Sequence, residues 1–386
     1  MGLIVYQGGL VDDMYEFLHM ALIKLRGGLM LSTMVAAGFF AACSGSSLAA
    51  AATFSKISIP EMIKRKYSVD FACGGVAAVG TQSALIPPSA LLIIYAIVAE
   101  QSVGKMLMAG ILPGILSNLL YCLTVIAVSR LIPSWIPYPD KNEKYSWADI
   151  KKHLPWIWPL PILMLLVLGV IYLGLCTPSE AAAVGASLAI AICIILTLLK
   201  SRYQSNDKIS LYNAIRKNRI GTAFISSTSS TAMIFFILIG AMMFGRFIAL
   251  SGVPVLLSEF IAGLDINRWL ILIGFMLLWT LLGTFMSATA IIVIIMPVIL
   301  PSIIALEFNI IWFGILAAKL SEVAMITPPV GLNLFAVKGA IGATATLGQI
   351  VRGTIPFLVT DFITIAILML FPIITLLIPN AMTTVP

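Results

Sequence analysis

The chain has 386 residues, of which 60% are hydrophobic and 10% charged, and its mean hydropathy is +1.08. This composition excludes an ordinary soluble domain, in which roughly a quarter of residues are charged. The net charge of +7 fits cytoplasmic loops better than nucleic acid, and two histidines and five scattered cysteines leave little material for a zinc site, a redox dithiol or a histidine-dependent triad. Because the apolar residues form long runs without period-2 alternation, we expect membrane-spanning helices.

The first long apolar segment comprises residues 27–54 and follows an amphipathic stretch at residues 8–26. Basic residues lie at both ends of this segment, with Arg26 before it and Lys56 after it. Since basic residues favour the cytoplasmic side, both ends are expected there, and the segment is predicted to be a re-entrant hairpin. Its tip would be the small, polar run at residues 43–47. A single straight helix with a serine-rich packing face is the alternative.

The next apolar segment, residues 71–99, is predicted to be one crossing that is broken in the middle. Residues 80–89 interrupt it, and the adjacent Pro87 and Pro88 stop a helix there. A complete crossing at residues 106–129 follows. A charged loop then leads to a pair of crossings, and a second charged loop leads to the rest of the chain.

An internal repeat relates the two ends of the chain. A shift of 241 residues places Ser46 on Ser287, Pro60 on Pro301, and Pro87-Pro88 on Pro328-Pro329. A shift of 243 residues places Gly110 on Gly353 and Pro113 on Pro356. The second hairpin, residues 269–300, is expected to open on the opposite membrane face, because an additional crossing precedes it. We therefore divide the chain into a first repeat at 1–129, a cytoplasmic loop at 130–153, a connecting helix pair at 154–199, a cytoplasmic loop at 200–219, and a second, inverted repeat at 220–386.

The predicted fold class is an all-α polytopic membrane protein with an inverted-topology repeat, two re-entrant helical hairpins and two Pro-Pro-broken helices. Inverted repeats with discontinuous helices are typical of secondary transporters, and we expect the elevator type of ion-coupled carrier. The crossing at residues 220–249 in the second repeat has no counterpart in the first. We therefore expect either a chain that is shortened at its N-terminus or a partner polypeptide that supplies the absent helix.

Unwound segments inside a membrane offer two kinds of binding chemistry. Free carbonyl and hydroxyl oxygens can replace the hydration shell of a sodium ion, and half-helix N-termini attract an anionic substrate. Suitable side-chain oxygens are those of Thr81, Ser83, Ser89, Thr284, Ser287, Thr289, Thr327 and Asn333. A single residue of this kind more often packs against a neighbouring helix, or hydrogen-bonds to the backbone of its own helix, than binds a ligand. The prediction therefore depends on the whole set.

Ionisable residues within the predicted crossings need partners, because a charge in hydrocarbon is costly. Lys319 and Glu322 lie three residues apart on one helix, so we expect them to form an intramembrane ion pair. This pair would fix helix packing, and a role of Glu322 in ion coupling is the alternative. Asp361 and Lys338 lie near predicted membrane ends and are expected to reach towards water.

Several short motifs resemble one known family. They are Leu25-Arg-Gly-Gly28, Ser44-Gly-Ser-Ser47, Pro60-Glu-Met62, Gly80-Thr81, Ile86-Pro-Pro-Ser89, Ala109-Gly-Ile-Leu-Pro-Gly114, Thr177-Pro-Ser-Glu-Ala181, Trp312-Phe-Gly314 and Ile326-Thr-Pro-Pro-Val-Gly-Leu-Asn333. With them, nearly the whole chain resembles the large membrane subunit of TRAP transporters, the tripartite ATP-independent periplasmic systems, in an N-terminally shortened form.

The resemblance implies a non-enzymatic permease of the bacterial inner membrane that imports a carboxylate-bearing solute, similar to sialic acid or a C4-dicarboxylate. A sodium gradient would drive uptake, with sodium as the coupling ion and no other cofactor, and the hairpin domain would move in an elevator-like way. The implied partners are a small four-helix membrane subunit, a periplasmic substrate-binding protein and the lipid bilayer, without nucleic acid.

The resemblance also implies the positions of the binding sites. The sodium-site residues would be Ser44, Gly45, Ser46, Gly80, Thr81, Gly283, Thr284, Ser287 and Thr327. The substrate would lie between the hairpin tips, near Ser47, Pro87, Pro88, Ser89, Thr289, Pro328, Pro329, Gly331 and Asn333. Many relatives carry an acidic residue where this chain has Ser287, so the second sodium site or the sodium stoichiometry is expected to differ.

Three other functions are compatible with parts of the sequence. One is a related sodium-coupled carboxylate carrier that works without a binding protein. Another is a truncated remnant that does not transport, which the absent helix suggests. The third is an intramembrane hydrolase with Ser44 or Ser46 as nucleophile, but His19 and His153 lie far along the chain from both, and G-x-S-x-G is absent.

Overall fold

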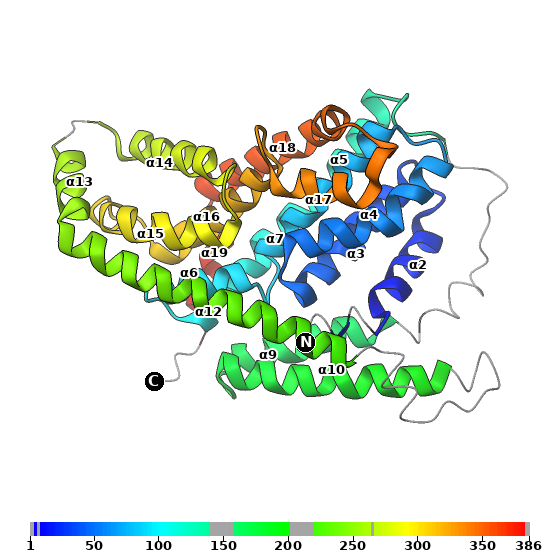
Figure 1. Cartoon of the computed structure of the whole chain (residues 1–386), viewed down its shortest axis with the longest axis horizontal. Helices are drawn as coiled ribbons and strands as arrows, with labels where there is room; N and C mark the ends of the chain where they lie inside the picture. The colour runs from blue at the N-terminus through cyan, green and yellow to red at the C-terminus, as the bar shows by residue number, and fades with distance from the viewer. Residues whose placement is uncertain are drawn as a thin grey trace.

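A computed structural model of the chain describes residues 4–5, 8–138, 154, 157–200, 220–263 and 266–382. Within these ranges all regular structure is helical (Figure 1). The first part contains α2 (Leu10–Leu22), α3 (Gly28–Ser44), α4 (Ser47–Lys64), α5 (Val69–Val79), η1 (Gly80–Ala84), α6 (Ala90–Val98) and α7 (Val103–Leu131). The connecting pair is α9 (Pro159–Tyr172) and α10 (Pro178–Lys200). The last part contains α12 (Ile220–Ser251), α13 (Val253–Ala262), α14 (Arg268–Gly283), α15 (Ala288–Ala305), α16 (Ile310–Ile326), α17 (Leu332–Ile341), η3 (Gly342–Thr344), α18 (Leu347–Leu370) and α19 (Ile373–Ala381).

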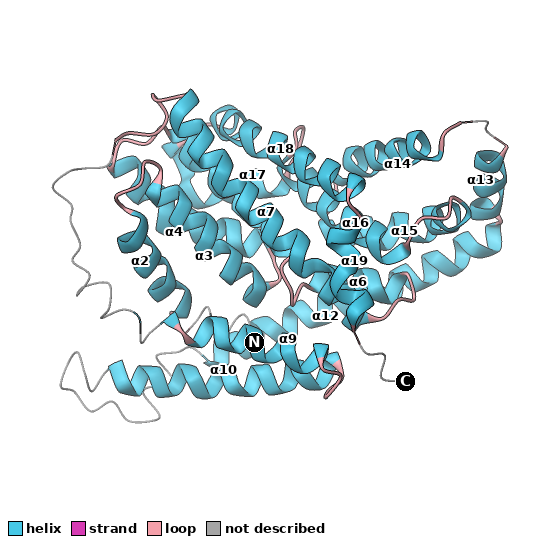
Figure 2. Ribbon diagram, turned by 180° about the vertical axis from the view of Figure 1, so that it is seen from behind, coloured by secondary structure: helices cyan, strands magenta, loops and turns pink. Residues whose placement is uncertain are grey.

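The helices have the composition of a multi-pass membrane protein. Within the described ranges, α7, α10, α12, α15 and α18 are long and apolar enough to cross a membrane. Helices α9 and α10 pack side by side along one edge of the molecule (Figures 1 and 2). The all-helical membrane fold predicted from the composition is therefore confirmed. Of the loops predicted at 130–153 and 200–219, residues 139–153 and 201–219 lie outside the described residues, while α7 extends to Leu131 and α10 to Lys200.

Helix pairs occupy both segments that were predicted to be hairpins. The first pair is α3 and α4, and the second is α14 and α15. Helix α4 extends to Lys64, beyond the predicted end of the segment at residue 54, so Lys56 lies on a helix and not in a loop. The reason is that residues 55–64 remain amphipathic, with Ile59 and Met62 buried. Insertion of either pair into a membrane from one side stays a prediction.

The two ends of the chain contain helices in the same order. Helix α4 begins at Ser47 and α15 at Ala288, 241 residues later, and both have 18 residues. Packing partners also correspond, since α5 packs on α18 while α16 packs on α7. In the same way α4 packs on α17 and α15 on α6. These two pairs of contacts are the kind that a two-fold relation between the ends would produce.

The closest contact between the two ends joins α5 to α18. A side chain on Gly353 would collide with the carbonyl oxygen of Asp70, so the absence of a side chain lets the two backbones approach. Next to this contact the ring centroids of Phe71 and Phe357 lie 5.8 Å apart, and those of Tyr121 and Phe357 lie 5.5 Å apart. This aromatic cluster forms part of the buried core.

A buried ion pair joins α16 to α18, and it corrects the predicted pairing. Lys319 Nζ lies 2.7 Å from Asp361 Oδ1, and both side chains are fully buried. Lys319 also donates to Ser117 Oγ at 3.0 Å and lies 5.2 Å from the ring centroid of Tyr121. Lys319 thus pairs with Asp361 and not with Glu322, because a carboxylate from a neighbouring helix reaches it more closely. The expectation that Asp361 lies near water is wrong for the same reason.

The ion pair gives a test of the packing between α16 and α18. We expect Lys319→Met or Asp361→Leu alone to cost about 3–5 kcal/mol of stability, since each leaves one buried charge without a partner. The double variant should recover most of this loss. Thermal unfolding of the purified protein in detergent measures it. Arg352→Met is the control, because the Arg352 side chain is 69% exposed and its pair with Asp70 should contribute at most about 1 kcal/mol. Additive losses in the double variant would contradict this assignment.

Candidate functional site

The loops of both helix pairs face one cavity of about 550 Å³. The first loop and the start of α4 contribute residues 45–49, and the second loop and the start of α15 contribute residues 287–289. In Figure 1 the two helix pairs extend from this point towards opposite ends of the molecule. Helices α6, α12 and α16 supply the remaining walls. We call this space the tip cavity.

Both tips begin a helix with a serine. Ser46 Oγ accepts a hydrogen bond from the Ala49 amide at 3.3 Å, and Ser287 Oγ accepts one from the Ala290 amide at 3.2 Å. Gly45 precedes the first cap with φ of +59°, a left-handed conformation that glycine adopts without strain. The N-termini of α4 and α15 therefore both face the tip cavity, and each carries a partial positive charge. The backbone of Ser44 ends α3, and its side chain lies outside the described atoms.

The first helix break lies directly behind the first tip. A Cβ atom on Gly80 would lie 2.7 Å from both the carbonyl oxygen of Ser47 and the side-chain nitrogen of Asn333. Asn333 is fully buried, and neither atom of its side-chain amide has a hydrogen-bond partner among the described residues. Thr81 is already engaged, since its hydroxyl donates to Ala78 O at 2.8 Å and lies 2.7 Å from the Tyr121 hydroxyl. At this break Gly80 leaves room for close neighbours, and the Asn333 side-chain amide is available to bind a ligand.

The second helix break contacts the second tip through the backbone. The amide of Gly331, which has φ of +62°, donates to the carbonyl oxygen of Thr284 at 3.4 Å. The hydroxyls of Thr284 and Thr327 donate to their own helices, to Leu281 O at 2.9 Å and to Val323 O at 2.6 Å. Backbone carbonyls, and not these hydroxyls, are therefore the oxygens that this region can offer to a cation. Gly283 packs directly on α16.

Glu322 is the acidic residue in the described lining of the tip cavity. It is 3% exposed, and its Oε2 atom has no hydrogen-bond partner among the described residues. Arg and Lys are absent from the same described lining. A buried carboxylate without a direct ion pair requires either a proton or a cation.

The predicted substrate residues fall into separate places. Ser47 and Thr289 line the tip cavity. Pro87 lines a different, apolar pocket of about 210 Å³ between α3 and α7. The remaining predicted residues lie around the breaks: Pro88 and Ser89 precede α6, Pro328 and Pro329 are exposed, and Gly331 and Asn333 begin α17.

Helix α12 contributes a polar wall that the sequence reasoning did not select. Ser227, Ser230 and Thr231 line the tip cavity together with the hairpin tips. They belong to residues 226–231, which are all serine or threonine within an otherwise apolar crossing. This run is the signal in the sequence that could have identified the wall, because six consecutive hydroxyls are costly to expose to lipid.

Comparison with known families shows the family of the chain. A family model described as "Tripartite ATP-independent periplasmic transporter, DctM component" matches residues 1–374. The chain belongs to this family. The predicted resemblance to the large membrane subunit of TRAP transporters is therefore confirmed, and the chain is a multi-pass permease subunit of the bacterial inner membrane.

Relatives with known names span nearly all of the chain. The C4-dicarboxylate TRAP transporter large permease protein DctM of Pseudomonas aeruginosa is 31% identical over 380 residues, which cover 98% of this chain and 84% of the relative. The sialic acid TRAP transporter large permease protein SiaM of Vibrio cholerae is 27% identical, covering 98% and 84%. The crystal structure of the Alcanivorax borkumensis YdaH transporter shares the fold, with a TM-score of 0.56, 15% identity and coverage of 98% and 84%.

The contact behind the first tip gives a second test of the structure. Gly80→Ala should destabilise the protein by about 1–3 kcal/mol, because the new methyl group overlaps the Ser47 carbonyl and the Asn333 amide. Thermal unfolding in detergent measures the effect. Gly274→Ala in α14 is the matched control, since no atom lies within 4 Å of its added Cβ. Equal stability of the two variants would show that the first tip does not pack on the first break.

Proposed function

We propose that this DctM-family chain imports an organic anion that carries a carboxylate, and that an inward sodium gradient drives the uptake. The observation that carries the proposal is the tip cavity. Two helix N-termini, a polar wall from α12 and the buried Glu322 carboxylate face the same space. An anion and a cation can therefore bind there side by side.

The described lining favours an anion that binds without an arginine or lysine clamp. The starts of α4 and α15 provide partial positive charge and free backbone amides, as helix N-termini do at many anion sites. The hydroxyl of Thr289 can donate a hydrogen bond beside them, whereas the Ser47 hydroxyl donates to Met325 Sδ at 3.5 Å. Relatives are named for C4-dicarboxylate, sialic acid and isethionate, which are all anions at neutral pH. We extend only the carboxylate class to this chain.

Sodium coupling follows from the charge in the cavity. In its ionised form Glu322 repels an incoming carboxylate, and this repulsion is strong in a medium of low dielectric constant. A co-transported cation would remove the repulsion, so the anion would bind well only with the cation present. Sodium prefers oxygen ligands, and the backbone carbonyls released at the two breaks would supply them.

We assign two places to sodium. At the first, the Ser47 carbonyl oxygen and the Asn333 side-chain amide lie against Gly80, and the lack of a hydrogen-bond partner for that amide among the described residues fits a ligand role. Gly45 and Ser46, which precede Ser47 in the chain, would contribute their backbone. At the second, the ligands would be backbone carbonyls near Gly283 and Thr327, with Ser287 close by. Ser44, Thr81 and Thr284 remain candidates through their backbone oxygens.

The elevator-type movement is also part of the proposal. Each hairpin packs on the broken helix of its own end and on the half-helix of the other end, so the two hairpins would move as one body. Helix α12 would form the static wall past which they move. We further propose the tripartite assembly, in which a periplasmic binding protein delivers the solute and a small membrane subunit completes the permease.

Reconstitution tests the proposal directly. The chain should be placed in proteoliposomes with the small membrane subunit, and uptake of radiolabelled succinate and sialic acid should be measured with the binding protein outside. We expect uptake only with an inward sodium gradient and only with the binding protein. Equal uptake with potassium in place of sodium would reject the coupling. Sodium-driven uptake without the binding protein would instead indicate a carrier that works alone.

Two single variants test the assigned residues. We expect Glu322→Gln and Asn333→Ala each to raise the sodium concentration for half-maximal uptake about tenfold or more, since each removes a buried charge or oxygen worth roughly 1–3 kcal/mol. Glu100→Gln and Asn380→Ala are matched controls, because both residues are exposed and lie outside the tip cavity. An unchanged sodium dependence in both test variants would remove these residues from the sodium sites.

A further inference from the structure

A second polar cavity lies at the other end of the first hairpin. Its volume is about 460 Å³, and its walls are the turn between α2 and α3, the end of α4 with the residues after it, and Pro137 and Tyr138. Helix α4 has 18 residues, and a helix rises ~1.5 Å per residue, so about 25 Å separates this cavity from the hairpin tip. We call it the basal cavity, and it is distinct from the tip cavity.

The described lining of the basal cavity has an excess of positive charge. Lys64, Arg65 and Lys66 line it, and Glu61 is the one acidic residue in that lining. Arg65 Nε lies 2.9 Å from Glu61 Oε1, so this pair is neutral and the two lysines supply the excess. Helix α3 begins and α4 ends at this place, and their opposite dipole charges offset each other. The lysine side chains therefore determine the sign of the potential in the cavity.

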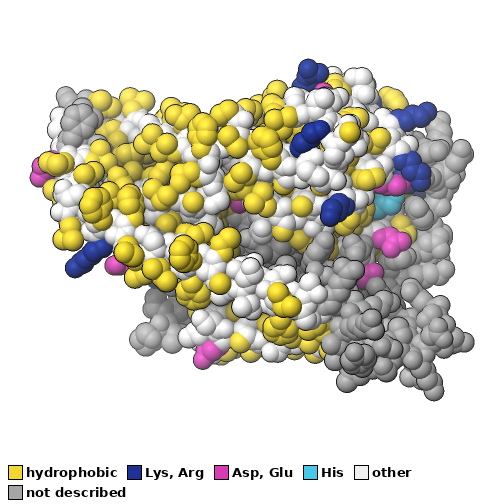
Figure 3. Space-filling view, viewed as in Figure 1, with side chains coloured by type: hydrophobic (Ala, Val, Ile, Leu, Met, Phe, Trp, Pro, Cys, Tyr) yellow, Lys and Arg dark blue, Asp and Glu magenta, His cyan; other side chains and the backbone are white. Residues whose placement is uncertain are grey.

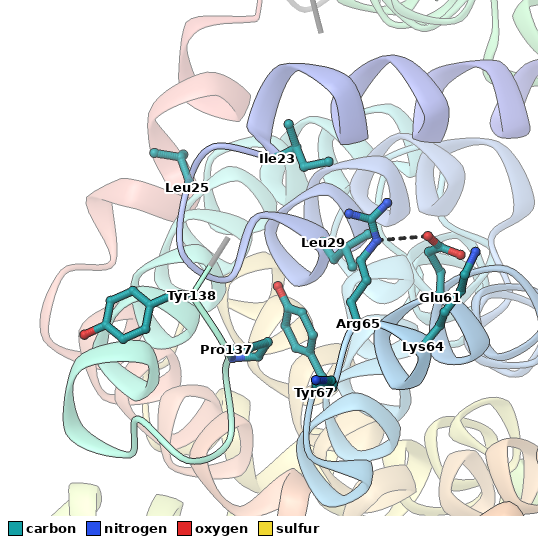
Figure 4. Close-up of a pocket in the computed structure, with 10 residues that line it drawn as sticks. Ile23, Leu25, Leu29, Glu61, Lys64, Arg65, Tyr67, Pro137 and Tyr138 are labelled. Carbon is teal, nitrogen blue, oxygen red and sulfur yellow. Dashed lines mark hydrogen bonds and ion pairs between the residues drawn. The ribbon is translucent and has the colours of Figure 1, made fainter. Parts of the chain in front are cut away.

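Neighbouring contacts hold the remaining polar wall in place. Tyr67 is 9% exposed, and in Figure 4 its hydroxyl points towards the turn between α2 and α3. Burial raises the pKa of Tyr67 to about 12, so its hydroxyl keeps its proton at neutral pH. On the other side, Arg26 donates to the carbonyl oxygens of Pro133 at 3.1 Å and Ile136 at 3.0 Å. The Arg26 guanidinium carbon also lies 4.1 Å from the ring centroid of Tyr138 and holds that wall in place.

An apolar rim adjoins this basic cavity. Leu25, which lines the cavity, is 50% exposed. Leu131 and Ile132, at the end of the membrane-crossing helix α7, are 80% and 36% exposed. Figure 3 shows several Lys and Arg side chains at the end of the molecule where α2 and α4 lie, together with some acidic and apolar ones. Cations beside exposed apolar side chains are typical of the boundary between lipid headgroups and acyl chains.

We propose that the basal cavity binds the headgroup of an anionic phospholipid. Lys64 and Lys66 would pair with the phosphate, and the acyl chains would lie along Leu25 and the end of α7. A free phosphate ion shares the headgroup chemistry, but it has no chains to cover the apolar rim. The bound lipid would connect the base of the first hairpin to the segment after α7.

Native mass spectrometry of the full chain in detergent tests this proposal. Dioleoylphosphatidylglycerol is titrated into the unmodified protein, the Lys64→Gln/Lys66→Gln variant and the Lys56→Gln/Lys105→Gln control, which loses the same charge elsewhere. Near a membrane surface each lysine contributes about fivefold in affinity, so the test variant should bind the lipid about thirtyfold more weakly. The control should change less than about threefold. Thermal unfolding in phosphatidylcholine alone verifies that all three proteins fold equally well.

Two further titrations identify the source of the phosphate. Dioleoylphosphatidylcholine has the same chains without net charge, and inorganic phosphate has the charge without chains. We expect neither to bind as tightly as phosphatidylglycerol. Equal binding of phosphatidylglycerol by the test variant and the unmodified protein would overturn the assignment to the lysines. Equal or tighter binding of inorganic phosphate would overturn the assignment to a lipid.

Discussion

A helix that is interrupted inside a membrane-spanning region leaves backbone amides and carbonyls that lipid cannot satisfy. This constraint governs the centre of the structure. Ser46, Ser89 and Ser287 each place a side-chain oxygen on an amide at the start of α4, α6 and α15. The second break is held differently, through the bond from Gly331 to the Thr284 carbonyl. The interruptions can therefore face a cavity with their remaining polar groups available for solutes.

The exchange of packing partners between the two ends explains how those interruptions stay together. Helix α4 packs on α17 and α15 packs on α6, so each hairpin is attached to a half-helix from the other end of the chain. The glycine contact between α5 and α18 joins the same two ends a second time. In the proposed mechanism this packing favours movement of both hairpins together, because separate movement would break contacts in both ends at once.

The sequence predicted those features that depend on local chemistry. Pro87-Pro88 and Pro328-Pro329 mark the breaks because two adjacent prolines interrupt a helix, and Ser46 and Ser287 mark the tips because serine caps the next helix. Features that depend on distant parts of the chain were not predictable in the same way. The partner of Lys319 is Asp361, which lies on another helix, whereas the sequence suggested Glu322 from its spacing alone. The hydroxyl run at residues 226–231 of α12 is visible in the sequence, but the cavity that it lines depends on how the helices are arranged.

The pairing of Lys319 with Asp361 determines which charge is left near the tip cavity. Once Asp361 neutralises Lys319, the Glu322 carboxylate has no cation of its own at ion-pair distance among the described residues. Residues 284–287, which form the second tip, include no acidic residue. In the proposed mechanism Glu322 supplies the negative charge that the second tip lacks, from a helix that packs directly beneath it. In its ionised form Glu322 would then need a cation at the cavity, and an organic anion would bind where that cation and two helix N-termini meet.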